Sequence, residues 1–538
     1  MNPSIALSIR DLTISLSGGP SLVRDLNLQV GQGEALGLAG ESGSGKSLTA
    51  LAIMGLLDPN RFEVRGQMEW THPLTAETMS LLDATPKAWQ TLRGRALAMI
   101  FQEPLTALNP VMRCGAQLEE CFLLYYPKWS REQRRTGMEK ALHEVHLEDT
   151  SRILQAYPHE LSGGQRQRLM IAMALSGNPS MLIADEPTTA LDTEVQASLV
   201  DLLGQLRRDR GLTLLFISHD LPLMSSLVDR WALMHQGDLL ETGPVHALSN
   251  AKEYPQMASL LAARPDPDRL PFRSTVEDRH GLLKVRDLSW TLPNGRTVVD
   301  NIALDLEAGG SLGIVGASGS GKSSLARMIA GLTPPTQGQV FLNGQPLWDQ
   351  GRFQGNLETR LAIQMVFQDP YSSLNPVHDV EQMLGTALQR KFPSLSLKER
   401  RERAYHWIAK VGLEPTRVAP RRPASFSGGQ RQRLVLARAL CLHPQILICD
   451  ESVAALDGTV QAQILELLLG LQQDLQFGMI FITHDLSVAG TLCHRLMVMD
   501  RGQAVEIASA QEVLQRPQHP YTQRLIQSIP RVQISQAS

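Results

Sequence analysis

The sequence repeats its own short motifs at long range. The glycine-rich residues 40–47 recur at residues 316–323, which is 276 positions later. Three further motifs recur 265 positions later: residues 161–165 as 426–430, Asp185-Glu186 as Asp450-Glu451, and His219-Asp220 as His484-Asp485. Self-similarity with a long period means that one structural unit is used more than once. The repeat therefore predicts two domains of one fold.

The repeat also sets the expected domain limits. A chain of 538 residues is longer than one hydrophobic core usually organises, and the motifs place one domain in residues 1–262 and the other in residues 280–538. Residues 263–279 contain Pro-Asp-Pro-Asp and many charges, which is typical of a linker. Because the offset falls from 276 to 265, we expect an insertion in the first half, in the polar stretch 66–92.

Short apolar runs alternate with helical patterns in both halves. Runs at residues 35–39 and 311–315 lead directly into the glycine-rich motifs. Other runs end at the Asp-Glu and His-Asp motifs; they are residues 181–184, 446–449, 212–218 and 479–483. Continuous apolar strands between helices are typical of a parallel sheet that is covered on both faces. Each half is therefore predicted to be an α/β domain.

Each half contains the pattern G-x-x-x-x-G-K-[ST] of a phosphate-binding loop, or P-loop. Its glycines let backbone N–H groups turn toward phosphates, and the following helix directs its positive end to the same place. Lys46 and Lys322 add a positive charge, and the hydroxyls of Ser47 and Ser323 can bind Mg²⁺. A single match can also be an ordinary glycine turn. Two matches, each after an apolar strand, favour ATP binding in both halves.

An Asp-Glu pair follows a second apolar strand in each half. Asp185 and Asp450 lie at strand ends, where ligands bind in open α/β sheets, and each can hold Mg²⁺ directly or through water. The adjacent Glu186 and Glu451 can orient and deprotonate an attacking water. An isolated pair is more often a solvated helix start. Two copies in register with the P-loops favour the catalytic interpretation.

The motif Leu-Ser-Gly-Gly-Gln at residues 161–165 and its copy Phe-Ser-Gly-Gly-Gln at residues 426–430 resemble the signature sequence of ABC transporter ATPases. The resemblance covers both halves almost end to end. It includes the Q-loop glutamines, the D-loops and the switch histidines of that family, which are Gln102 and Gln368, residues 190–192 and 455–457, and His219 and His484.

The resemblance implies an α/β fold with two tandem P-loop NTPase (ABC-type) nucleotide-binding domains, each with a mainly parallel sheet, a helical subdomain and an antiparallel β part. It implies ATP and Mg²⁺ as cofactors. The implied catalytic residues are Glu186, Glu451, His219 and His484, and the implied Mg²⁺ ligands are Ser47, Gln102, Asp185, Ser323, Gln368 and Asp450. The implied ATP-binding residues are Gly40, Ser42, Gly43, Gly45, Lys46, Ser47, Gly316, Ser318, Gly319, Gly321, Lys322, Ser323, Ser324, Ser162, Gly163, Gly164, Gln165, Ser427, Gly428, Gly429 and Gln430.

The signature motif has a physical reason. Ser162, Gly163 and Gly164 are predicted to open a helix over residues 165–175, which leaves backbone N–H groups for an anion. In the family these groups bind the γ-phosphate of ATP held by the opposite domain. The resemblance therefore implies an intramolecular head-to-tail dimer, in which the first P-loop pairs with residues 427–430 and the second with residues 162–165, with one copy of the chain per transporter.

Some positions depart from the family pattern. Many members carry an aromatic residue before the P-loop that stacks on adenine, but Leu16 and Leu292 occupy that place here. Trp290 is either a substitute in the second half or a residue of the strand core. Phe426 and Ser452 replace the Leu161 and Pro187 of the first half, and neither change removes a catalytic group. We expect two hydrolytically competent sites.

The segments after the Q-loop glutamines resemble the oligopeptide/dipeptide/nickel importer branch. They are residues 101–110 and 367–376, and residues 183–192 and the His-Pro-Tyr-Thr tail at 519–522 also match. The resemblance implies a subunit that hydrolyses ATP to energise import of a small solute, either a peptide or nickel or a metal chelate. The implied partners are two integral-membrane permeases and an extracytoplasmic solute-binding protein, with no nucleic acid.

The alternative is a soluble tandem-cassette ATPase that acts on ribosomes or DNA. Translation factors of that type usually have a long charged connector, whereas residues 263–279 are short and mixed. DNA-repair relatives insert zinc-binding cysteines or long coiled coils, and the sequence has neither. The importer interpretation is therefore favoured.

Composition agrees with a membrane-associated ATPase that does not itself span the membrane. The net charge of −3 gives no general attraction to nucleic acid, and no segment approaches the length of an apolar membrane span. The first 16 residues alternate like a strand and lack the features of a secretion signal.

The five cysteines (Cys114, Cys121, Cys441, Cys449, Cys493) form no C-x-x-C pair and are expected to be reduced structural thiols. Residues 244–279 and 507–538 contain no cysteine, so we expect no iron–sulfur cluster. The expected location is peripheral, at the cytoplasmic face of the inner (cell) membrane.

Overall fold

The computed structural model divides the chain into two compact units. It describes residues 4–102, 107–189, 191–248, 250, 252–262, 270, 272–273, 281–349, 351–369, 371, 373–453, 456 and 458–531. The first unit comprises Met1–Leu191, Val195–Ala262 and Pro530–Ser538, and the second comprises Asp192–Glu194 and Ala263–Ile529. The exact limits 1–262, 263–279 and 280–538 stay a prediction. Of the predicted D-loops, residues 190, 455 and 457 lie outside the described residues.

An antiparallel sheet opens the first unit. Its strand order is β2-β1-β4-β5, with β1 at Ile5–Leu16, β2 at Ser21–Gly31, β4 at Phe62–Thr71 and β5 at Thr78–Ser80. Residues such as Leu7, Ile9 and Met68 point from one face of this sheet into a core, which they share with apolar residues of the second sheet. Because antiparallel strands alternate between core and solvent, the other face stays polar.

The second sheet of the first unit is mainly parallel, as predicted. Its order is β10-β9-β3-β8-β7-β6, and only the pair β9–β10 is antiparallel. The strands are β3 Ala35–Gly40, β6 Leu97–Ile100, β7 Met181–Asp185, β8 Thr213–Ile217, β9 Arg230–His235 and β10 Asp238–Pro244. Every residue of β3, β7 and β8 is buried, which explains the continuous apolar runs in the sequence.

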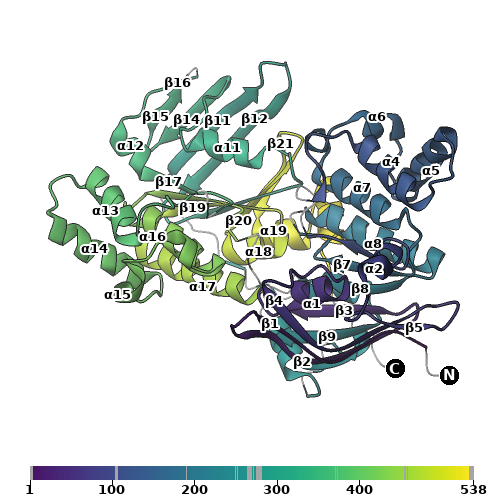
Figure 1. The fold of residues 1–538 in the computed structure, drawn as a ribbon. Helices are drawn as coiled ribbons and strands as arrows, with labels where there is room; N and C mark the ends of the chain where they lie inside the picture. The colour runs from purple at the N-terminus through teal and green to yellow at the C-terminus, as the bar shows by residue number, and fades with distance from the viewer. Residues whose placement is uncertain are drawn as a thin grey trace. The chain divides into compact units, whose positions relative to one another are not determined.

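Helices cover the parallel sheet and form a helical subdomain. They are α1 Lys46–Ile53, α2 Pro86–Leu92, α4 Cys114–Tyr125, α5 Arg131–Glu144, α6 Thr150–Gln155, α7 Gly163–Leu175, α8 Thr193–Arg210, α9 Leu221–Ser225 and α10 Pro255–Ala262, with short 3-10 turns at Pro158–Glu160 and Val245–Ala247. Within the first unit, α4, α5 and α6 gather next to α7 and away from β1 and β2 (Figure 1). Helix α5 begins at a capping box, in which Ser130 and Gln133 bond to each other's backbone N–H groups.

The second unit has the same architecture. Its antiparallel sheet has the order β12-β11-β14-β15-β16, and its mainly parallel sheet has the order β17-β18-β19-β13-β20-β21. The strands are β11 Gly281–Thr291, β12 Thr297–Glu307, β13 Ser311–Val315, β14 Gln337–Leu342, β15 Gln345–Asp349, β16 Arg352–Phe353, β17 Ile363–Val366, β18 Ile446–Asp450, β19 Gly478–Thr483, β20 Arg495–Asp500 and β21 Gln503–Ser509.

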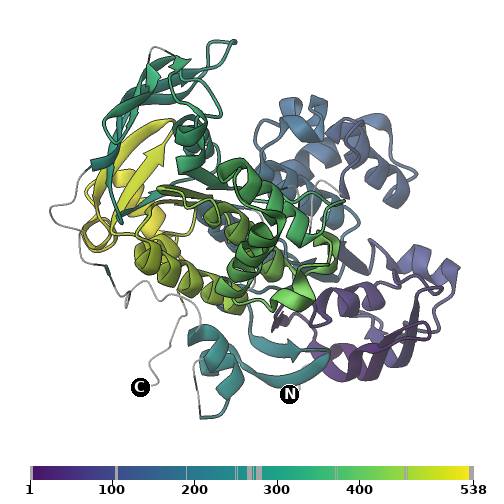
Figure 2. The same cartoon turned by 90° about the vertical axis from the view of Figure 1, so that its left-hand side faces the viewer.

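The helices of the second unit also follow the order of the first. They are α11 Lys322–Ile329, α12 Leu357–Ala362, α13 Val380–Lys391, α14 Leu397–Lys410, α15 Pro415–Val418, α16 Gly428–Leu440, α17 Gly458–Leu475, α18 Leu486–Leu492, α19 Ala510–Gln515 and α20 Pro520–Gln527, with a 3-10 turn at Pro423–Ser425. In Figure 2 the teal antiparallel strands and the green helices of this unit lie at opposite ends of it. The predicted fold class is confirmed in both units.

The insertion in the first half is more dispersed than the sequence predicted. Met68 pairs with Ile9 and Val340 pairs with Val285, so these matching positions are 272 residues apart, whereas the P-loops are 276 apart. Part of the extra length therefore precedes residue 66. The stretch 66–92 holds more of it, chiefly because β4 and β5 are joined by a longer loop than β14 and β15. The predicted site, residues 66–92, therefore holds only part of the insertion.

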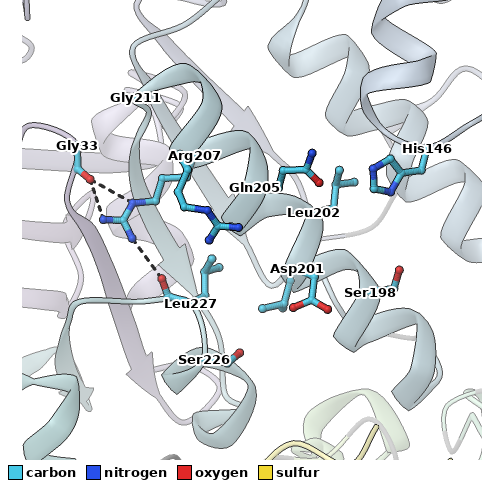
Figure 3. Close-up of a pocket in the computed structure, with 13 residues that line it drawn as sticks. Gly33, His146, Ser198, Asp201, Leu202, Gln205, Arg207, Gly211, Ser226 and Leu227 are labelled. Carbon is cyan, nitrogen blue, oxygen red and sulfur yellow. Dashed lines mark hydrogen bonds between the residues drawn. The ribbon is translucent and has the colours of Figure 1, made fainter. Parts of the chain in front are cut away.

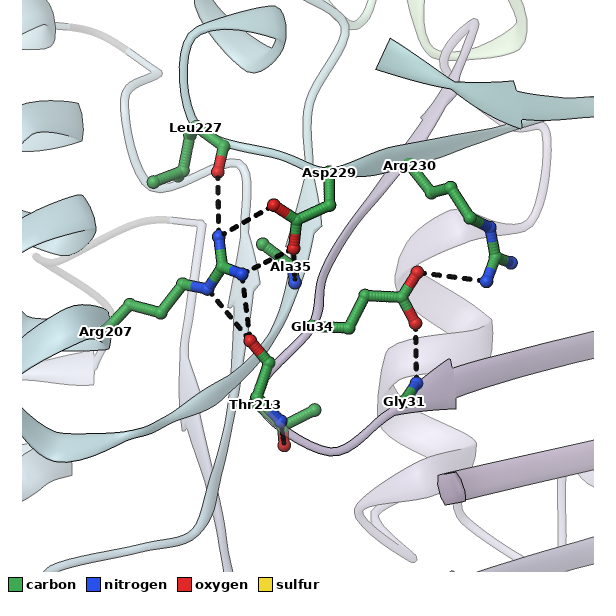
Figure 4. Close-up of polar contacts among 9 residues, drawn as sticks. Gly31, Glu34, Ala35, Arg207, Thr213, Leu227, Asp229 and Arg230 are labelled. Atoms are coloured by element: carbon green, nitrogen blue, oxygen red, sulfur yellow. Dashed lines mark hydrogen bonds and ion pairs between the residues drawn. The ribbon is translucent and has the colours of Figure 1, made fainter. Parts of the chain in front are cut away.

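A partly exposed arginine clamp joins the loops at the base of the parallel sheet in the first unit. Arg207, near the end of α8, donates to the carbonyl oxygen of Gly33 at 2.9 and 3.1 Å, to that of Leu227 at 3.4 Å, and to the Asp229 carboxylate (Figure 4). Asp229 in turn accepts from the N–H of Ala35 at the start of β3, at 2.9 Å. The clamp fixes where β3 begins, and β3 leads directly to the P-loop.

The same clamp borders an open cleft of about 870 Å³ along α8 (Figure 3). Its lining includes Ser198, Asp201 and Gln205 on the helix, and His146 from the helical subdomain. None of the predicted ATP-site residues is among its described lining residues. The cleft is therefore a feature of the helix face and not part of the P-loop site.

The second unit builds this clamp from different residues. Gln472 and His494 lie 265 positions after Arg207 and Asp229. Gln472 donates to the carbonyl of Gly310 at 3.2 Å, and the Nδ1 atom of His494 accepts from the N–H of Ser311 at 3.1 Å. A guanidinium comes instead from Arg273, which donates to Gln472 and to the carbonyl of Leu492 at 3.0 Å.

Arg273 belongs to the predicted linker. Leu270 is buried and Phe272 packs against the core of the second unit, so all three described residues of residues 263–279 contact this unit. The other residues of the predicted linker lie outside the described residues. The part of the linker that the structure describes is therefore part of the second unit.

The described residues also bear on the predicted membrane spans and cysteines. Within the described residues, no helix is both long and apolar enough to cross a membrane. All five cysteines are free thiols, and four of them are buried, which agrees with a structural role. Burial raises the pKa of the Cys114 thiol to about 11, so this thiol stays protonated.

Replacing Arg207 tests the clamp of the first unit. Arg207→Ala leaves the carbonyls of Gly33 and Leu227 without their donor, which we expect to cost about 1–2 kcal/mol of local stability. Backbone amides of β3 and β9 are then expected to exchange with deuterium about 5- to 30-fold faster. The matched control is Arg208→Ala on the exposed side of α8, which is expected to change little. Equal exchange in both variants would show that the clamp does not hold β3.

Candidate active site

The first P-loop joins β3 to α1 with a tight backbone. Gly40, Gly43 and Gly45 have φ angles of 147°, 79° and 101°, a region that side chains strongly disfavour. A Cβ atom on Gly40 would lie 2.2 Å from the carbonyl oxygen of Met234. Glycine at residue 40 is therefore required both for the turn and for the close approach of β9.

Lys46 lies inside this loop. It is 4% exposed, and its Nζ atom donates to the carbonyl oxygens of Gly40 at 2.8 Å and Glu41 at 2.7 Å. The buried ammonium thus sits at the N-terminal end of α1, where the helix dipole and the loop N–H groups also favour an anion. This combination is suited to phosphate groups.

The second P-loop repeats the geometry. Gly316, Gly319 and Gly321 have φ angles of 151°, 79° and 101°, and Lys322 donates to the carbonyl oxygens of Gly316 and Ala317 at 2.8 and 2.9 Å. Burial lowers the pKa of Lys322, while the charges of Glu451 and Asp450 oppose that shift. Both loops therefore offer one buried cation to a phosphate.

A serine hydroxyl and an aspartate meet beside each P-loop. Ser47 Oγ donates to Asp185 Oδ1 at 3.0 Å, and Ser323 Oγ donates to Asp450 Oδ1 at 2.8 Å. Burial is the main cause that raises the pKa of Asp185 to about 6, and the neighbouring Glu186 adds to it, although Ser47 and Lys46 oppose it. The pKa of Asp450 is raised for the same main reason. Each aspartate is a buried carboxylate that a cation would stabilise.

The residues of this cluster fit Mg²⁺. Among the described residues, no group of three or more His, Cys, Asp and Glu side chains could hold a metal. Mg²⁺ does not need such a group, because it usually binds one or two carboxylates together with waters and substrate phosphates. A serine hydroxyl and a buried carboxylate next to a phosphate-binding loop supply that type of oxygen ligand.

Three donors converge on one oxygen of Glu186. Gln102 Nε2 and Thr189 Oγ1 donate to Glu186 Oε2 at 3.0 Å each, and His219 Nδ1 lies 3.3 Å from the same oxygen. Burial opposes the charge on Glu186, but the hydrogen bond and charge of His219, together with Lys46, outweigh it and lower the pKa. Glu186 is therefore held ionised and oriented, as a general base requires.

The second unit holds Glu451 through the matching glutamine. Gln368 Nε2 donates to Glu451 Oε2 at 2.8 Å. Glu186 and Glu451 have φ angles of 45° and 47°, and their N–H groups bond to the neighbouring strands at Ile217 and Ile482. A left-handed backbone in a residue other than glycine is uncommon and clusters at functional sites. The sites differ at two groups, because the described side chains of His484 and Glu451 form no ion pair like that of His219 and Glu186, and residue 454, which corresponds to Thr189, is alanine.

The signature motifs form helix N-termini. Helix α7 begins at Gly163, two residues earlier than predicted, with Ser162 as its N-cap, and α16 begins at Gly428 with Ser427 as its N-cap. Gln165 is part of a reciprocal capping box: its N–H bonds to Ser162 Oγ at 3.2 Å, and its side chain accepts from the Ser162 N–H at 3.1 Å. The N–H groups of Gly163 and Gly164 have no intrahelical acceptor, so they are suited to an anion.

The structure thus brings the predicted residues Gln102, Asp185, Glu186 and His219 together beside the first P-loop, with the signature helix elsewhere in the unit. In the second unit, contacts join Ser323 to Asp450 and Gln368 to Glu451, whereas the described side chain of His484 makes no such contact with Glu451. Their roles in catalysis stay predictions. Leu16 and Trp290 lie in β1 and β11, and Trp290 packs against the core, as expected of a strand residue. Sequence reasoning missed Thr189 and also Tyr521, which contacts the second P-loop. Thr189 lies in the segment 183–192 and Tyr521 in the segment 519–522, and both segments resemble the family. That resemblance pointed to the segments but gave no role to either side chain.

Two copies of a P-loop, a buried aspartate and an oriented glutamate define a tandem P-loop ATPase. A model of the ABC transporter family matches residues 23–189 and 299–454, and a model of the oligopeptide/dipeptide transporter C-terminal region matches residues 505–537. The chain belongs to the ABC transporter family.

Individual relatives support the same assignment. The chain is 39% identical to the glutathione import ATP-binding protein GsiA of Escherichia coli strain K12, over 94% of this chain and 86% of that protein. GsiA of Shigella sonnei gives the same identity and coverage. A solved archaeal ribosome recycling factor, aABCE1 in complex with the ribosomal stalk protein aP1, has a TM-score of 0.61 at 19% identity over 92% of this chain and 88% of that chain. That likeness shows the fold alone.

The chain is therefore an ATP-binding importer subunit with two cassettes. Its hydrolysis of ATP energises import through membrane permeases, and it acts as a peripheral subunit. The alternative of an ATPase acting on ribosomes or DNA is not favoured.

The raised pKa of Asp185 predicts a pH dependence of stability in the absence of nucleotide and divalent cations. The pKa is about 6 in the folded chain against an ordinary value of 3.8, so the folded chain holds this proton more tightly. Its contribution to stability is complete below about pH 4 and is lost as pH rises through about 6. We expect Asp185→Asn, which keeps an acceptor for Ser47, to raise the melting temperature at pH 7.5.

The size of that gain should depend on pH. Melting curves between pH 4 and 8 are expected to show the gain shrinking as pH falls from about 6 to about 4. The control, Asp201→Asn on the exposed face of α8, should show no such trend. A gain that is constant across this range, or no gain at neutral pH, would contradict the assigned cause.

Proposed function

We propose that the chain energises the uptake of a short peptide of the size of glutathione, from the cytoplasmic face of the inner membrane. The observation that carries this proposal is the 39% identity to glutathione import ATP-binding proteins across both cassettes, together with the oligopeptide-type C-terminal region. Two permeases would form the channel, and an extracytoplasmic solute-binding protein would deliver the peptide. Nickel, the other solute of the resembling branch, has no support from these relatives.

Each ATP site would be built from both cassettes. The first P-loop would hold ATP through Gly40, Ser42, Gly43, Gly45 and Lys46, and residues 427–430 would complete the site. The second P-loop would be completed by residues 162–165. This arrangement is supported by the signature helices, whose first N–H groups lack intrahelical acceptors and so can bind an anion. One copy of the chain then supplies both sites of a transporter.

Mg²⁺ would be held by Ser47, Asp185 and Gln102 in the first site, and by Ser323, Asp450 and Gln368 in the second. The hydroxyl–carboxylate contacts of 3.0 and 2.8 Å support this set, as does the raised pKa of both aspartates. When bound, Mg²⁺ neutralises charge on the phosphoryl group being transferred. A cation here also removes the penalty of burying the carboxylate.

Glu186 and Glu451 would act as general bases toward the attacking water. Gln102 and His219 hold the first carboxylate by one oxygen, which keeps it ionised and fixes its plane. The same glutamine is a proposed Mg²⁺ ligand, so the presence of Mg²⁺ and the phosphates would be communicated to the Q-loop. The Q-loop is where the permease would be coupled.

Exposed apolar residues beside each Q-loop support a docked permease. Val111 and Val377 are 80% and 68% exposed, and they lie 266 residues apart, as Gln102 and Gln368 do. Phe101 and Tyr371 are also exposed, at 39% and 51%. Apolar side chains in matching exposed positions are typical of a surface that a partner covers. Each cassette would therefore dock one permease.

Mutation of both glutamates tests the catalytic assignment. Glu186→Gln with Glu451→Gln keeps the size and polarity of the side chains but removes the base. We expect ATP binding to remain and the ATPase rate to fall by on the order of 10²-fold or more. Glu466→Gln, an exposed glutamate on α17, is the control and should keep the wild-type rate. Near-normal hydrolysis in the double variant would overturn the assignment.

Uptake of labelled glutathione tests the proposed solute. In cells that lack this chain, the wild-type chain is expected to restore uptake, whereas the chain with both Glu→Gln changes is expected to restore none. Labelled dipeptides and nickel ions, measured in parallel, define the selectivity. Uptake of glutathione that is equal with and without the wild-type chain, while a dipeptide depends on the chain, would reject glutathione but keep the peptide class. Dependence of nickel uptake alone would overturn the peptide class.

A further inference from the structure

The C-terminal region of the second unit reaches the second P-loop. Tyr521, in the first turn of α20, accepts a hydrogen bond through its hydroxyl oxygen from the N–H of Ala317 at 3.0 Å. Ala317 follows Gly316 in the P-loop, and its own carbonyl accepts from Lys322 Nζ at 2.9 Å. The same loop residue is therefore held on its N–H side by Tyr521 and on its carbonyl side by the P-loop lysine.

Tyr521 is fixed by its surroundings. It is 5% exposed and belongs to the core cluster together with Leu525 of the same helix. Glu506 on β21 accepts from the N–H groups of Gln518 and His519, at 3.0 Å each, directly before α20. Burial raises the pKa of Tyr521, so its hydroxyl stays neutral. Tyr521 is thus a rigid, neutral acceptor aimed at the loop.

The first unit has a different residue in this position. Pro255 and Pro520 start the two matching helices, 265 residues apart, so Gln256 corresponds to Tyr521. Gln256 is exposed, and its N–H donates to Glu241 at 3.1 Å. In the first P-loop, Glu41 takes the place of Ala317, and its carboxylate lies 3.8 Å from His235. The two P-loops are therefore supported by different chemistry.

We propose that Tyr521 is a positioning residue of the second ATP site, which holds the second P-loop in its phosphate-binding form and raises the affinity of that site for ATP. This inference rests on the proposed assignment of the P-loops as the two ATP sites. Its physical reason is pre-organisation: a loop ordered before binding loses less conformational freedom when the nucleotide arrives. The C-terminal region, which matches the oligopeptide/dipeptide family, then acts on one ATP site and not on both.

Tyr521→Phe tests the proposal, because it removes the hydroxyl and keeps the ring that packs in the core. ATP binding is measured on the full chain in two backgrounds: Lys46→Ala, in which the second site is read, and Lys322→Ala, in which the first is read. We expect Tyr521→Phe to weaken binding about 3- to 10-fold in the Lys46→Ala background, as for loss of one hydrogen bond. In the Lys322→Ala background it should change nothing.

The ATPase reaction supplies a second measurement. With Glu186→Gln silencing the first site, Tyr521→Phe is expected to raise the KM for ATP by the same factor and to leave kcat unchanged. Unchanged affinity in the Lys46→Ala background, or equal weakening in both backgrounds, would overturn the positioning role. Binding of two ATP molecules per chain in both lysine backgrounds, where one is expected, would instead show that the P-loops are not the ATP sites, so failure of that assignment is distinguishable.

Discussion

The buried aspartate at the end of a fully apolar strand is the constraint on which the rest of each unit depends. Asp185 and Asp450 are each 4% exposed, and burial raises the pKa of both. A charge in that place is unfavourable unless cations and donors surround it. The serine hydroxyl and the buried P-loop lysine supply part of that compensation, and Mg²⁺ with the phosphates of ATP would supply the rest. The site would thus be stabilised by its substrate.

This constraint explains why so much of the structure converges on the strand ends. The P-loop glycines bring a lysine beside the aspartate, and the arginine clamp fixes where the strand before the P-loop begins. The adjacent Glu186 leaves the strand with a left-handed backbone and is then oriented by Gln102, Thr189 and His219. The P-loop, the Asp-Glu pair, the Q-loop glutamine and the switch histidine of the first unit meet here because their charges must be balanced together.

Sequence alone predicted the features that depend on local patterns. The P-loops, the buried strands such as β3 and β18, and the helix that opens at Ser162 follow from glycine spacing, apolar runs and the signature motif. The features that the sequence did not predict depend on contacts between residues that are distant in the sequence, and no motif predicts such contacts. Arg273 replaces a helix arginine from within a segment that looked like a free linker, and Tyr521 contacts a loop 204 residues away. Part of the insertion preceded residue 66, because only strand register reveals it.

The two units share a fold, but different side chains hold some of the matching strands and glutamates in place. The clamp contains an Arg–Asp pair in the first unit and a glutamine, a histidine and Arg273 in the second. The glutamate has a threonine donor in the first unit, whereas residue 454 is alanine. These differences lie around the P-loops and catalytic glutamates and leave those groups themselves intact. We therefore expect two competent sites with unequal properties.

The central claim is that this paired ATPase acts on membrane permeases. The most direct measurement is to isolate the tagged chain from gently solubilised cells and to identify and quantify the proteins bound to it. The account predicts two polytopic membrane proteins in amounts equal to the chain. Ribosomes or DNA-repair proteins with no membrane protein would contradict it, although the paired ATPase sites would remain.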